Sequence, residues 1–126
     1  MGRRMKRDMD LVRQILLCIE AYDHGRAPHN LCIDGFSTEQ VGYHVYIMIE
    51  GGLLDGANST TLKSKGYEAI ASRITWEGHE FLDAARDDRR WKKACALVKE
   101  KSGAVTLAVM SQLLTAMALQ SLGLSK

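Results

Sequence analysis

The segment from Ser37 to Gly52 constrains the fold of this chain more than any other, because it carries a helix signal at each end. Ser37 stands three residues before Gln40, the capping-box spacing that satisfies free amides in the first turn of a helix. Gly51 and Gly52 supply a stop, since glycine takes the left-handed conformation that ends many helices. An apolar stripe recurs between these signals at helical spacing: Val41, Val45, Met48 and Ile49. We predict one amphipathic helix from about Ser37 to Gly51.

The residues after this helix predict a β-hairpin. Leu53 and Leu54 begin one apolar stretch, and the residues from about Ile70 to Thr75, rich in β-branched side chains, form a second. The segment 56–66 between them is polar, so we expect a long, mobile hairpin tip.

A further helix is expected before this central part. Asp8 can cap it, and Leu11, Val12 and Ile15 begin an apolar stripe that continues to about Tyr22. Residues 23–30 contain the single proline and several turn formers, which indicate a loop. Residues 31–33 are a candidate short strand.

Helices are also expected after the hairpin. Thr75 can cap a helix with Trp76, Phe81 and Leu82 as core residues and His79 partly buried, and a kink is expected at residues 87–88. The last helix, about 106–122, has an apolar face that fits either packing back onto the first helix or a seam between two copies of the chain. The residues of this proposed seam are Leu107, Met110, Leu113, Leu114 and Met117.

The charge distribution gives only weak support for a nucleic acid partner. The net charge is +2, whereas proteins that bind duplexes usually carry a strong basic excess. The cations are unevenly placed, however. A basic arm leads the chain, and a weaker basic set surrounds the expected hairpin. The arm holds Arg3, Arg4, Lys6 and Arg7, and the second set is Lys63, Lys65 and Arg73.

Residue usage indicates a cytoplasmic protein without a cofactor. The three cysteines, Cys18, Cys32 and Cys95, lack CxxC spacing and are expected to be buried or inert. We see no secretory signal, and the polar residues in the apolar stretch 105–124 disfavour a membrane span. A zinc site at Cys18, His24, His29 and Cys32 is disfavoured by irregular spacing, and the sequence HEFLD at 79–83 lacks the second histidine of a metalloprotease helix. We find no catalytic motif and predict no enzyme activity.

Four stretches resemble the signature of an uncharacterised bacterial and phage family of unknown function. They are MKRDMDLVR at 5–13, GFSTEQVGYHV at 35–45, GGLL at 51–54 and ITWEGHEFLDAARDD at 74–88. That family is similar to winged helix-turn-helix proteins, and the resemblance covers residues 5 to about 100. The resemblance implies a mainly α fold with a small β-hairpin, in which a winged helix-turn-helix-like domain is followed by C-terminal helices. The expected divisions are a basic arm at 1–7, the winged-helix-like domain at 8–88 and a helical extension at 89–126.

Two functions fit this picture. The first is a DNA-associated regulator of a bacterium or its phage that contacts phosphates with the arm and the hairpin. Its candidate residues are Arg3, Arg4, Lys6, Arg7, Gln40, Tyr43, His44, Lys63 and Lys65. The helix at 37–51, however, presents Glu39 and Glu50 outward and no cation, which disfavours reading of the major groove.

The second function is a protein-interaction adaptor or inhibitor on the same fold. Its candidate surface combines Tyr43, Tyr46 and Ile47 with the apolar face of the last helix, because aromatic side chains anchor many interfaces. The two functions are nearly balanced on sequence, and DNA is ahead only by analogy of fold.

Overall fold

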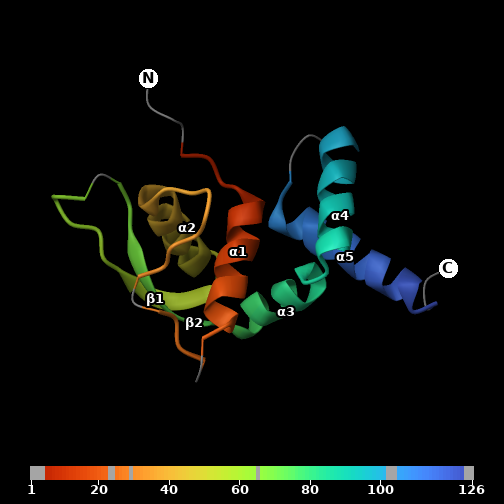
Figure 1. Ribbon diagram of the computed structural model, residues 1–126, viewed down its shortest axis with the longest axis horizontal. Helices are drawn as coiled ribbons and strands as arrows, with labels where there is room; N and C mark the ends of the chain where they lie inside the picture. Colours follow the sequence, from red (N-terminus) through yellow and green to blue (C-terminus); the bar gives the residue numbers. More distant parts are fainter. Residues whose placement is uncertain (1–4, 23–24, 29, 65, 102–104, 124–126) are drawn as a thin grey trace. The chain divides into compact units, whose positions relative to one another are not determined.

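The computed structural model describes residues 5–22, 25–28, 30–64, 66–101 and 105–123 (Figure 1). These residues are mainly helical and contain one antiparallel hairpin, as predicted. In chain order the elements are α1 (Met9–Glu20), α2 (Thr38–Glu50), β1 (Leu54–Asn58), β2 (Ala69–Ile74), α3 (Trp76–Ala85), α4 (Asp88–Lys101) and α5 (Leu107–Ser121).

The chain forms two compact units that meet within α3, between His79 and Glu80. The first unit holds α1, α2, the hairpin and the first turn of α3. The second unit holds the rest of α3 together with α4 and α5.

The signals at the ends of α1 and α2 act as the sequence predicted. The Asp8 carboxylate accepts hydrogen bonds from the amides of Asp10 and Leu11 and so caps α1. At α2 the Ser37 hydroxyl accepts from the Gln40 amide, and the Gln40 side chain accepts from the Ser37 amide, completing the capping box. Gly51 is the C-cap, and Gly52 follows with φ +83° in the left-handed region.

The core of the first unit is the apolar stripe of α1, packed with α2 and the hairpin. The side chains of Leu11, Ile15 and Leu16 are fully buried. α2 and the hairpin add buried side chains at Val41, Val45, Met48, Leu54, Ala71 and Ile74. Each Å² of apolar surface that these side chains remove from water contributes about 25 cal/mol to the free energy of folding. Burial in this core is therefore the main source of stability of the first unit.

The hydrogen bonds of the hairpin continue beyond its two strands into the tip. β1 and β2 pair from Leu54↔Ile74 to Asn58↔Ala69, with a bulge between Asp55 and Gly56. Beyond the strands, Thr60 exchanges hydrogen bonds with the backbone of Glu68. The Ser64 hydroxyl donates to the Glu68 carboxylate at 2.7 Å. The tip that we expected to be mobile is therefore cross-linked by hydrogen bonds.

Several predictions for the loops and for α3 are wrong. Residues 31–33 form no strand. The expected kink at 87–88 is a break between two helices, α3 and α4. Cys32, expected to be buried or inert, is exposed, while Cys18 and Cys95 are half-buried.

The first turn of α3 also differs from prediction. Trp76 is 76% exposed and His79 is exposed, whereas Phe81 and Leu82 are buried as expected. The buried face of α3 runs through Gly78, Phe81 and Leu82, at helical spacing. Trp76 stands two residues before Gly78 and therefore projects from the opposite side of the helix.

In the second unit, α5 packs against α4. Phe81 and Trp91 meet edge to face with ring centroids 6.0 Å apart. Met110 and Leu114 are fully buried within a single copy of the chain. The proposed seam between copies therefore cannot use these two residues, while Leu107, Leu113 and Met117 remain half-buried.

Candidate functional site

The predicted site residues on α2 do not share one exposed face. Tyr43, Tyr46 and Ile47 are half-exposed, as is Gln40, whose side-chain oxygen is engaged in the capping box. Glu39 and Glu50 are exposed. His44 is different from all of these, because only 1% of its surface is exposed.

His44 is a structural hydrogen-bonding residue. Its Nε2 accepts from the amide of Asp8 at 2.9 Å, and its Nδ1 lies 2.8 Å from the carbonyl oxygen of Gln40, to which it donates in this tautomer. With both ring nitrogens engaged inside the fold, His44 is not available for the DNA contact that we predicted. The ring instead ties the start of α1 to α2.

Burial lowers the pKa of His44, because the charged imidazolium loses hydration inside the fold. The hydrogen bond to Gln40 and the nearby Asp8 carboxylate oppose this shift, and Arg7 adds to it. The folded protein therefore favours the neutral ring. Protonation would also remove the lone pair that accepts from the Asp8 amide.

We expect the protein to lose stability as the pH falls from about 7 to about 5. In this range the histidine of the unfolded chain binds a proton, whereas buried His44 in the folded protein stays neutral. Urea unfolding across this range should show the midpoint falling with pH. His44→Gln should remove this dependence, whereas the same change at the exposed His79 should leave it intact. A midpoint independent of pH in the parent protein would contradict the assignment of a neutral buried His44.

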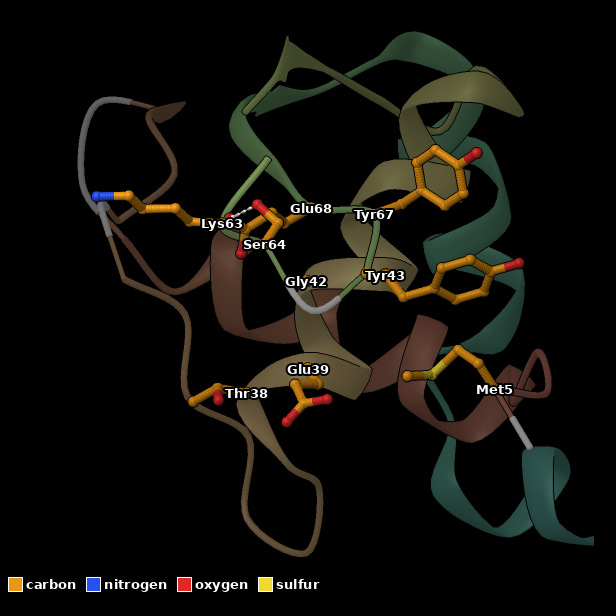
Figure 2. A pocket seen from close by; sticks show the side chains of 10 residues that line it. Met5, Thr38, Glu39, Gly42, Tyr43, Lys63, Ser64, Tyr67 and Glu68 are labelled. Atoms are coloured by element: carbon orange, nitrogen blue, oxygen red, sulfur yellow. Dashed lines mark hydrogen bonds between the residues drawn. The ribbon is translucent and has the colours of Figure 1, made fainter. Parts of the chain in front are cut away.

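A groove of about 490 Å³ lies between the first half of α2 and the hairpin tip (Figure 2). Thr38, Glu39 and Tyr43 line it from α2, Lys63 and residues 66–68 line it from the hairpin tip, and Met5 lines it from the segment before α1. The two walls come within van der Waals reach at Gly42, where a Cβ would lie 3.4 Å from the Glu68 Cβ, an ordinary contact distance. The hairpin tip thus lies along the outer face of α2.

Three tyrosines give this region an aromatic surface. Tyr46 and Tyr67 are in ring contact, with centroids 5.0 Å apart and planes tilted by 30°. In Figure 2 the Tyr43 and Tyr67 side chains project in the same direction, one from α2 and one from the hairpin. Tyr67 is 58% exposed, so a large part of its ring faces solvent. We call Tyr43, Tyr46 and Tyr67 the tyrosine cluster.

The charges around the groove are mixed. Lys63 is exposed at the hairpin tip, and the carboxylates of Glu39 and Glu68 lie in the same groove. Arg73 does not add a free cation, because it pairs with Asp55 on the neighbouring strand. Residues 1–79 as a whole contain nine Lys and Arg against ten Asp and Glu. The unit that contains α2 therefore has no basic excess.

Of the other basic residues predicted to contact DNA, the structure describes Lys6 and Arg7. Lys6 and Arg7 are exposed and directly precede Asp8, whose amide is bound to His44 on α2. Arg3, Arg4 and Lys65 lie outside the described residues. Residues 5–7 therefore lead into the fold beside α2, and Met5 lines the groove.

Of the residues that line the groove, the sequence prediction included only Tyr43 and Lys63; Met5, Tyr67 and Glu68 are among those that it missed. Tyr67 had a signal, since it is the one aromatic residue in the polar run 56–69. Met5 and Glu68 had none, because their positions depend on how the arm and the hairpin tip fold onto α2.

The described residues contain no group of three His, Cys, Asp or Glu side chains that could hold a metal ion. His24 and His29, two members of the zinc set that we considered, lie outside those residues. No helix among the described residues has the length and hydropathy needed to cross a bilayer.

Comparison with known proteins identifies the family of the chain. Residues 6–104 match the model of a family described as hypothetical protein (DUF2513), and the chain belongs to that family. A protein of Haemophilus influenzae, described as an uncharacterized protein, is 35% identical over 111 residues, which cover 86% of this chain and 91% of the relative. No solved structure matches the chain significantly.

Proposed function

We propose that this chain is a non-enzymatic protein-interaction module, an adaptor or inhibitor, that binds a segment of another protein in the groove between α2 and the hairpin tip. The observation that carries the proposal is the tyrosine cluster at that groove. Tyrosine supplies a large contact area at a small cost in side-chain entropy and is enriched at the energetic centres of interfaces. Mixed charges at the rim suit a polar border around such a centre.

The geometry of α2 supports protein over DNA as the partner. A recognition helix needs an open face that can enter the major groove, usually with Arg, Lys, Asn or Gln toward the bases. Here the hairpin tip lies along that face, with Tyr67 against Tyr46. A helix-turn-helix motif also pairs its second helix with another across a short turn. The helix that precedes α2 among the described residues is α1, and residues 21–37 separate the two, which is not a short turn.

Site-specific photo-crosslinking in the native host tests the proposal. A benzophenone side chain in place of Tyr67 is expected to form an adduct that protease removes and nuclease does not. The same side chain at Tyr22 is the matched control, because Tyr22 is exposed at the end of α1 and does not line the groove. Nucleic acid adducts at position 67, or equal protein adducts at both positions, would overturn the proposal.

The affinity of the identified partner then measures the contribution of the groove. Tyr43→Ala is expected to weaken binding by about 2 kcal/mol, or about 30-fold in Kd, as at other aromatic interface centres. Tyr22→Ala should leave the Kd unchanged. An equal loss in both variants would indicate general destabilisation instead of a groove contact.

Binding to duplex DNA is a second candidate, favoured by one observation: Lys6, Arg7 and Lys63 are all exposed. Such contacts would be made to phosphates by the arm and the hairpin, without base reading by α2. Affinity should then fall steeply with salt and weaken when the arm is deleted. Lys63→Ala should reduce the slope of log K against log salt by about 1. Absence of binding at low ionic strength would exclude this candidate.

A further inference from the structure

A second groove, of about 600 Å³, lies between α4 and α5 and is lined only by residues between 87 and 121. Its apolar side chains are Leu97 from α4 and Leu113, Ala116 and Met117 from α5, and Ala116 is the one small side chain among them. Leu97 is 40% exposed, and Leu113 and Met117 are half-buried. Met110 and Leu114, which form the packed contact of the second unit, are fully buried and do not line the groove.

Each wall of this groove is a regular row of side chains on one helix. Arg89, Lys93 and Leu97 recur every four residues along α4, so they lie one above another. Leu113, Met117 and Gln120 form the corresponding row on α5. Each row is a ridge of side chains on its own helix, the kind of surface against which the ridges of another helix pack.

The rim of the groove is positively charged. Arg89, Arg90 and Lys93 line it, with Asp87 as the one acidic side chain of the lining. The Asp87 carboxylate accepts a hydrogen bond from the Arg90 amide at 2.9 Å and thereby caps α4, and that bond is the main cause of its lowered pKa. The basic excess of the chain is concentrated on α4, which carries six Lys and Arg against two acidic residues. Three of the six, Arg89, Arg90 and Lys93, line the groove.

We propose that this groove binds an amphipathic helix of another protein, one whose apolar row is flanked by Asp and Glu. The apolar row would pack on Leu97, Leu113 and Met117, and its carboxylates would meet Arg89, Arg90 and Lys93. Charge complementarity of this kind selects partners and raises association rates. A second copy of the chain fits less well, because a two-fold interface brings the same patch of each copy together and would set these cations against one another.

A display library of helical peptides with a fixed leucine row and randomised flanking positions tests the proposal on the full chain. Selection is expected to enrich Asp and Glu over Lys and Arg at the flanking positions. The double variant Arg89→Glu/Lys93→Glu should weaken binding of a selected peptide by about tenfold or more, since two rim contacts become repulsive. Leu97→Ala should also weaken it, because the peptide's apolar row then has less surface to pack on.

The matched control is Lys92→Glu/Lys99→Glu, which changes the net charge equally on the same helix but at residues outside the groove lining. It should change the Kd of the selected peptide much less than the rim variant does. Tyr43→Ala should have no effect, so failure here is separable from failure of the α2–hairpin proposal. No acidic enrichment, equal effects of the two double variants, or self-association abolished by the rim variant would each overturn the inference.

Discussion

Gly78→Ala is expected to destabilise the fold by about 3 kcal/mol, because small-to-large changes at tightly packed sites force the surroundings apart. Gly78 lies in the first turn of α3, where its amide donates to the Thr75 hydroxyl at 3.0 Å. A Cβ at this position would overlap the backbone oxygen of Leu53 and the Ile74 side chain. The Leu53 oxygen is fixed in turn by a hydrogen bond from the Thr75 amide at 3.1 Å.

Helix propensity alone predicts the opposite result, a gain in stability, so the measurement distinguishes clearly between the two effects. Alanine is favoured over glycine inside a helix by about 1 kcal/mol. Gly42→Ala in α2 is the matched control, since the new Cβ would make only an ordinary contact with Glu68. Urea unfolding should show a lower midpoint for Gly78→Ala and an unchanged or higher midpoint for Gly42→Ala. A neutral or stabilising Gly78→Ala would contradict the close packing of α3 on Leu53.

Leu114→Ala is expected to cost about 3 kcal/mol, within the range for a leucine deleted from a closed core. Leu114 lies on α5 and is fully buried within one copy of the chain. The cost has two parts, the transfer free energy of the deleted methyl groups and the weaker van der Waals attraction among the side chains that line the resulting cavity.

Leu119→Ala on the same helix is its control, because Leu119 is 42% exposed and its removal leaves no closed cavity. Its expected cost is below about 1 kcal/mol. Chemical denaturation, with size measured in parallel by light scattering, checks both variants. If Leu114→Ala were stable but reduced the oligomeric mass, Leu114 would belong to a seam between copies instead of the monomer core.

Sequence reasoning succeeded where the structural signal is local. The limits of α2 follow from Ser37, Gln40 and Gly52, whose cap and turn chemistry acts within a few residues of each position. The stripe on α1 was also accessible, because apolar periodicity reports which face is buried. The pairing of β1 with β2 was accessible because two apolar stretches flank a polar segment.

Predictions failed where a contact distant in sequence decides the outcome. His44 lies three residues after Val41 and four before Met48, so its spacing placed it on the buried face of α2. We nevertheless treated it as a DNA contact, because a buried imidazole requires partners that the sequence does not identify. The Asp8 amide, 36 residues away, is one of those partners. Trp76 is exposed for a similar reason, since the approach of Gly78 to Leu53 sets which side of α3 is buried.

The candidate groove was the least predictable feature. Tyr43 and Lys63 were both identified, but nothing local indicated that they line one cavity. That proximity arises because the hairpin tip folds along α2 and is held in shape by the bonds among Thr60, Ser64 and Glu68.

The unequal surroundings of the cysteines offer a practical route to following this protein in solution. Cys32 is exposed in the connection before α2, whereas Cys18 and Cys95 are half-buried. Burial, with a smaller effect of neighbouring Cys32, raises the pKa of the Cys18 thiol and so reduces its reactive thiolate. A maleimide dye at limiting concentration should therefore attach first at Cys32. The native chain then carries a fluorescent reporter without any engineered residue.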